Sequence, residues 1–92
     1  MNPSTDQIQQ IRQQLHDSLQ SLRTLRDEIR IDLHLAGMEA KDKWRALEPH
    51  FEEAERFARE VSETSRTALE EIVAKYRAFR ESLKGPQAPS MR

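Results

Sequence analysis

The chain has 92 residues, a formal net charge of −1 and no cysteine. This length allows one domain, and the lack of cysteine excludes disulfides, cysteine-based zinc sites and thiol nucleophiles. Ala, Glu, Lys, Leu and Arg make up 44 of the 92 residues, close to the half that is typical of long helices and coiled coils. The composition therefore predicts an all-α, coiled-coil-like protein.

An apolar stripe with steps of three and four residues runs along residues 8–83. This spacing is that of one face of an α-helix, so the chain is built of amphipathic helices. Gly85 can take the conformation that ends a helix, and Pro86 cannot continue one. We therefore predict a single helical domain over residues 1–84, followed by a disordered tail over residues 85–92.

Gly37 and Pro49 are the two positions where the helix can break. Basic side chains precede Pro49 and three glutamates follow it, which is the polarity expected where one helix ends and another begins. The sequence thus predicts a corner at Leu47-Glu48-Pro49, with a first helix over about residues 4–47 and a second over about 49–84. Gly37 has no capping neighbours and is interpreted as a glycine inside the first helix.

Two helices of these lengths can fold back on each other as a long antiparallel hairpin. In the expected register Leu25 faces Ile72 and Leu22 faces Tyr76. The predicted hairpin core consists of Leu22, Leu25, Ile29, Leu33, Ala36, Ala40, Trp44, Phe57, Val61, Leu69, Ile72, Tyr76 and Phe79. The alternative is one helix kinked at Pro49, because the apolar stripe stays in phase across the proline.

The segment over residues 29–38 differs from the rest because it is apolar on two sides. Ile31, Leu35 and Met38 lie opposite the face that would pack in the hairpin. Two amphipathic helices cannot enclose a core by themselves, so we predict that these three residues form an oligomer interface. Two first helices would meet there, giving a homodimeric four-helix bundle.

Three points about this segment stay open at the level of sequence. The pattern does not distinguish a dimer from a tetramer. A helix of another protein is as compatible with the second apolar face as a copy of this chain. The alternation over residues 29–35 also matches a half-buried strand, although the sequence offers no second strand to pair with it.

No motif in the sequence supports catalysis. It contains no HExxH, no glycine-rich phosphate loop and no Ser-His-Asp grouping. His34, Met38 and Asp42 lie one helical turn apart, but His34 is interpreted as a boundary residue and Met38 as an interface residue. We predict no catalytic residue, no metal site, no cofactor and no small-molecule substrate.

Nucleic acids and lipid surfaces are two further classes of partner to weigh. Tyr76 and Phe79 are interleaved with a cluster of basic side chains that would suit phosphates: Lys75, Arg77, Arg80, Lys84 and Arg92. Compensation of the helix dipole explains the same charges. An amphipathic helix can also lie on a lipid or granule surface, but the polar face here carries both signs of charge.

The sequence has no apolar stretch long enough to span a bilayer and no signal peptide at its start. We therefore expect a cytoplasmic protein. The function that these observations favour is a non-enzymatic scaffold or adaptor that acts through helix–helix contacts, first of all with a second copy of itself.

Overall fold

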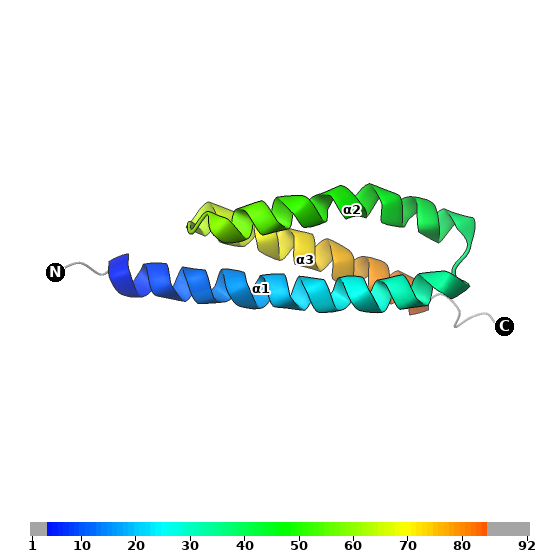
Figure 1. The fold of residues 1–92 in the computed structure, drawn as a ribbon, viewed down its shortest axis with the longest axis horizontal. Helices are drawn as coiled ribbons and strands as arrows, with labels where there is room; N and C mark the ends of the chain where they lie inside the picture. Colours follow the sequence, from blue (N-terminus) through cyan, green and yellow to red (C-terminus); the bar gives the residue numbers. More distant parts are fainter. Residues whose placement is uncertain (1–3, 85–92) are drawn as a thin grey trace.

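The fold is a bundle of three helices in a computed structural model that describes residues 4–84 (Figure 1). Within these residues α1 spans Ser4–Asp32, α2 spans Met38–Arg59 and α3 spans Glu63–Lys84. A short 3₁₀ turn, η1, spans Leu33–Leu35 and leads from α1 into α2. The prediction of an all-α fold is confirmed. The predicted disordered tail lies outside the described residues.

The two-helix hairpin is wrong, because the chain reverses direction twice. In Figure 1, α1 and α3 run in the same direction and α2 runs in the opposite one. The predicted antiparallel pairs of Leu25 with Ile72 and of Leu22 with Tyr76 are therefore wrong as well. A third helix solves within one chain the problem that made two helices insufficient, since three amphipathic faces can enclose a common core.

Most of the predicted core residues lie in the core of this bundle. Trp44 is the centre of an aromatic cluster, with its ring centroid 5.5 Å from that of Tyr76 and 6.0 Å from that of Phe79. The buried members are Leu22, Leu25, Ile29, Leu33, Trp44, Leu69, Ile72, Tyr76 and Phe79. The partly buried members, which pack against them, are Ala36, Ala40, Phe57 and Val61.

The predicted corner at Leu47-Glu48-Pro49 is wrong, because α2 continues through Pro49. Phe51 and Ala54 follow the proline in phase with Trp44, and all three side chains are buried. The alternative of one helix kinked at Pro49 is wrong too, because the chain also reverses near Gly37 and Ser62. Only the continuation of the helix across Pro49 holds, and α2 is visibly bowed near its middle in Figure 1. Burial of residues on both sides of the proline outweighs its cost of about 3 kcal/mol inside a helix.

The first break in the chain falls at Gly37, where the sequence was interpreted as helix interior. Ala36 and Gly37 are both extended, with ψ of 157° and 178°. The Ala36 amide donates to the Leu33 carbonyl at 3.1 Å, and the Gly37 carbonyl accepts from the Lys41 amide at 3.2 Å. Gly37 is therefore the N-cap residue of α2. Glycine is a poor helix former but is accepted at this position, which is why the break falls here.

Gly37→Pro is expected to be tolerated, with a change in the free energy of unfolding of less than about 1 kcal/mol. The φ angle of Gly37 is −79°, close to that of proline, and the preceding residue is extended as proline requires. Urea unfolding followed by circular dichroism measures the change. The same substitution at exposed Ala78 inside α3 is the matched control, for which a loss of about 3 kcal/mol is expected. A comparable loss at Gly37 would mean that the helix runs on through this residue.

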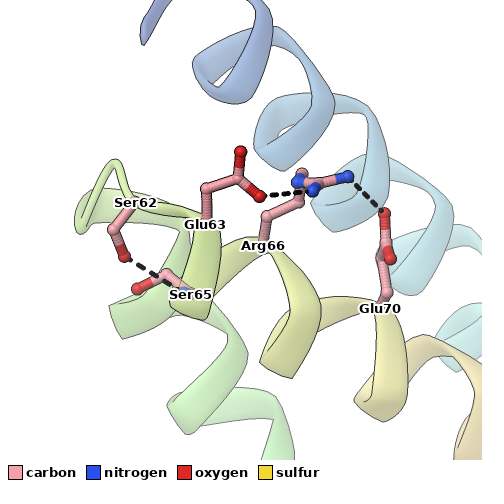
Figure 2. A network of polar contacts seen from close by, with 5 residues as sticks. All are labelled: Ser62, Glu63, Ser65, Arg66 and Glu70. Atoms are coloured by element: carbon pink, nitrogen blue, oxygen red, sulfur yellow. Dashed lines mark hydrogen bonds and ion pairs between the residues drawn. The ribbon is translucent and has the colours of Figure 1, made fainter. Parts of the chain in front are cut away.

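The second break, between α2 and α3, was not predicted. Ser62 caps α3, because its Oγ accepts a hydrogen bond from the Ser65 amide at 3.1 Å (Figure 2). The Ser65 side chain is 2% exposed and its Oγ donates to Glu60 Oε1 at 3.1 Å. Ser62 followed directly by Glu63 is the sequence signal that indicates this helix start.

Ion pairs along the first turns of α3 complete this end of the bundle. Arg66 donates from Nη2 to Glu63 Oε1 at 2.7 Å, and its Nη1 lies 3.7 Å from Glu70 Oε2 (Figure 2). Spacings of three and four residues put these side chains on the same side of the helix. These pairs lie along the surface of α3 and use the two terminal nitrogens of Arg66, while its Nε is buried without a hydrogen-bond partner.

Candidate interaction surface

Three large apolar side chains remain exposed where α1 turns into α2. Ile31 is 67% exposed, Leu35 95% and Met38 70%. These are the three residues predicted as an oligomer interface, and together they are called the turn surface below. A side chain as exposed as Leu35 gains nothing from the fold of its own chain, although burying a leucine is worth about 1.5–3 kcal/mol.

The local structure explains why this segment is apolar on two sides in the sequence. Leu33, 9% exposed, points into the core and anchors the turn, while Leu35 follows two residues later in the 3₁₀ turn and points outward. The helical pattern therefore ends at Asp32. Ile31, Leu35 and Met38 come from the end of α1, from η1 and from the start of α2. Their predicted arrangement on one face of a single helix is wrong.

A shallow cleft of about 550 Å³ lies beside the turn surface. It is bounded by Leu35, Ala36 and Ala40 on the side of the turn and by Ser82 and Leu83 in the last turns of α3. The same end of the molecule thus combines exposed apolar side chains with a hollow between two elements. This combination is typical of a surface that receives another protein.

At the opposite end of the bundle, α1 extends beyond its partners. Figure 1 shows the start of α1 protruding past the turn between α2 and α3. Leu15 is its first buried residue, Ile11 is partly buried, and residues 6–10 are all exposed. We call residues 4–10 the α1 overhang. Ile8 lies in it with 42% of its surface exposed. A segment this short has little helical stability of its own.

The two ends of the bundle also differ in charge. The half with the α2–α3 turn, residues 4–23 and 49–73, contains nine acidic and five basic side chains. The half with the turn surface, residues 24–48 and 74–84, contains seven acidic and nine basic ones. The half with the α1 overhang is therefore net acidic and the half with the turn surface is net basic, while the residues next to the turn surface in the chain carry both signs of charge.

The described chain offers few side-chain arrangements suited to functions other than protein binding. Residues 4–84 contain no group of three or more His, Asp or Glu side chains arranged to hold a metal ion. His34 and Met38, weighed as ligands from the sequence, are both exposed on the turn. No helix in this range is long and apolar enough to cross a membrane.

The basic cluster near the end of α3 does not form a surface for stacking nucleic-acid bases. Tyr76 and Phe79 are 0% and 7% exposed and pack against Trp44, so their rings are not available to bases. Arg80 Nε lies 3.1 Å from Glu28 Oε1 on α1. Arg92 lies outside the described residues.

Sequence reasoning found the turn surface but missed the α1 overhang. The apolar pattern identifies Ile8 as part of the stripe, and only the lengths of α2 and α3 leave it without a neighbour.

Comparison of the chain with protein-family models, with curated proteins and with solved structures gives no match. The surfaces at the two ends of the bundle are accordingly what a functional assignment rests on.

Proposed function

We propose that this chain is a non-enzymatic helical scaffold that associates with a second copy of itself through the turn surface. The observation that carries the proposal is the exposure of Ile31, Leu35 and Met38 at one end of the bundle. The other large apolar side chains of residues 4–84, Ile8 apart, are buried or partly buried. Exposed apolar side chains clustered in this way mark a binding surface more often than a free one.

The charges around the turn surface favour a protein partner over a lipid surface. Arg30 and Lys41 lie close to it in the chain, and so do Asp32, Glu39 and Asp42. A surface that contacts anionic lipids carries mainly basic residues around its apolar centre. Both signs of charge suit a protein partner, because these side chains can pair with opposite charges on its surface.

The predicted homodimer remains the smallest assembly that covers the turn surface. Its helix count changes, because each chain provides three helices rather than two. A dimer through this surface would therefore contain six helices instead of a four-helix bundle. An interface built on three large apolar side chains is small, and small interfaces are typical of weak, concentration-dependent association.

Light scattering on a size-exclusion column tests the proposal. The wild-type mass is expected to rise above the 10.8 kDa of the monomer as the loaded concentration increases. Leu35→Glu places a charge at the centre of the turn surface and is expected to return the mass to 10.8 kDa, with an unchanged circular dichroism spectrum.

Ala46→Glu is the matched control, because Ala46 is an exposed residue of α2 outside the turn surface. It adds the same charge and is expected to leave the association unchanged. A wild-type chain that stays at the monomer mass at all concentrations contradicts the proposal. Flotation of the wild-type monomer with anionic liposomes, lost in Leu35→Glu, would instead assign the turn surface to a lipid boundary.

A further inference from the structure

We propose that the partner of the turn surface is the α1 overhang of a second copy, so that the chains associate head to tail. This inference rests on the proposed self-association and specifies its geometry. Two copies could also meet with turn surface against turn surface, and the distribution of apolar side chains, charge and shape distinguishes the two arrangements.

The distribution of exposed apolar side chains favours the head-to-tail contact. In the described residues, the large apolar side chains that remain exposed are Ile8 at one end and Ile31, Leu35 and Met38 at the other. A contact between two turn surfaces covers the last three and leaves Ile8 in water. A head-to-tail contact covers all four side chains in a single interface.

Charge favours the same arrangement. The α1 overhang belongs to the half with nine acidic and five basic side chains, and the turn surface belongs to the half with seven acidic and nine basic ones. Head-to-tail contact brings together two halves of opposite net charge, whereas contact between two turn surfaces brings together two halves that are both net basic. Complementary potentials of this kind steer association and orient the partners.

The shapes of the two ends also match. Residues 4–10 make about two helical turns, a length of some 10 Å. This α1 overhang protrudes from the bundle in Figure 1. The receiving end offers the cleft of about 550 Å³ between Leu35 and Leu83. A protruding helix that lays an apolar side into a groove is a recurrent mode of protein recognition. Ile8, with Ile11 one turn later, is the side chain that would enter first.

A heterologous contact of this kind leaves one free surface at each end of every assembly. The association therefore has no closed dimer as its endpoint, and it extends as an open chain unless the rotation between copies closes a ring. The mass is expected to grow with concentration beyond twice that of the monomer. An isologous contact between turn surfaces would stop at two copies.

Complementation between two variants tests the inference. Leu35→Glu disables the turn surface and keeps the α1 overhang, while Ile8→Glu disables the overhang and keeps the turn surface. Each variant alone is expected to be a monomer of about 10.8 kDa. An equal mixture retains one intact pair of surfaces, so it is expected to form a 1:1 complex of twice that mass and to go no further.

Gln9→Glu is the matched control for Ile8→Glu, because Gln9 is the exposed neighbour in the same overhang and acquires the same charge. It is expected to associate like the wild type. If Leu35→Glu is a monomer while Ile8→Glu still associates, the turn surface pairs with itself and the head-to-tail inference is overturned, while the proposed self-association stands. If Leu35→Glu associates like the wild type, both proposals fail.

Salt provides an independent readout. Attraction between halves of opposite net charge is screened by added salt, so the wild-type mass at a fixed concentration is expected to fall between low and high ionic strength. Contact between two net basic halves would respond in the opposite direction, because salt then relieves repulsion. A mass that rises with salt therefore contradicts the head-to-tail contact.

Discussion

Replacing Pro49 with alanine is expected to stabilise the protein by about 1–3 kcal/mol. Pro49 lies in the interior of α2 and is exposed, so an alanine fits there without contact to the core. Proline has no amide hydrogen, whereas alanine restores a hydrogen bond to the carbonyl four residues before it. The full helix penalty is not recovered, because proline also restricts the unfolded chain by about 0.4–1 kcal/mol.

Thermal and urea unfolding, followed by circular dichroism, measure this gain. For a domain of this size each kcal/mol corresponds to a rise in melting temperature of about 4–8 °C. Lys43→Ala, at another exposed position of α2, is the control and is expected to change stability by no more than about 0.5 kcal/mol. A loss of stability in Pro49→Ala would mean that the bow in α2 is needed for Trp44 and Phe51 to reach the core together.

The free energy of unfolding is expected to fall by about 2–3 kcal/mol between pH 10 and 12, because Tyr76 ionises more readily in the unfolded chain than in the folded one. Its side chain is fully buried, and its hydroxyl donates to the Leu47 carbonyl at 2.9 Å. Burial raises the pKa of Tyr76 to about 12; Arg26 opposes this effect and Glu48 adds to it. The unfolded chain has a tyrosine pKa of about 10. Between these values the unfolded state releases the proton and the folded state keeps it, so stability present below pH 10 is lost as the pH rises.

This titration can be followed directly, because Tyr76 is the only tyrosine in the chain. The near-ultraviolet absorbance of the tyrosinate reports its pKa, and urea unfolding at each pH reports stability. Tyr76→Phe is expected to cost about 1 kcal/mol at neutral pH through the lost hydrogen bond and to have a flatter profile above pH 10. A tyrosinate signal that appears near pH 10 in the folded protein would show that the ring is exposed.

Helix content and most of the core were predictable from the sequence because they depend on local spacing. Leu22, Leu25 and Ile29 repeat with the period of an α-helix, and any fold that uses this helix must bury that side. The same is true of Trp44 and Tyr76. The turn surface was found for a related reason, since Leu35 and Met38 do not fit the buried stripe whichever way the helices are joined.

The positions of the two chain reversals were not predictable by the same reasoning. Flanking charges indicated Pro49, but helix-dipole effects are worth about 0.3–1 kcal/mol each, less than the burial of Phe51 and Ala54 on the far side of the proline. Gly37 lacked polar capping side chains, yet it needed none, because an extended glycine can begin α2 unaided. Ser62 is a helix-capping residue and signals the second break. The apolar stripe continues through this position without interruption, however, and for that reason no break was predicted there.

The sequence by itself determined that the protein is helical, most of the side chains that form its core, and the three apolar residues that stay exposed at the turn. Four buried apolar residues of the described chain were missing from the predicted core: Leu15, Phe51, Ala54 and Val73. Only the tertiary structure decided that there are three helices, that α1 and α3 are parallel, and that Ile8 protrudes at the end opposite Leu35. The periodicity of apolar residues shows which side chains share one face of a helix over a few turns. Where a chain reverses depends on which arrangement buries the most apolar surface from distant segments, and that sum is not contained in any local pattern.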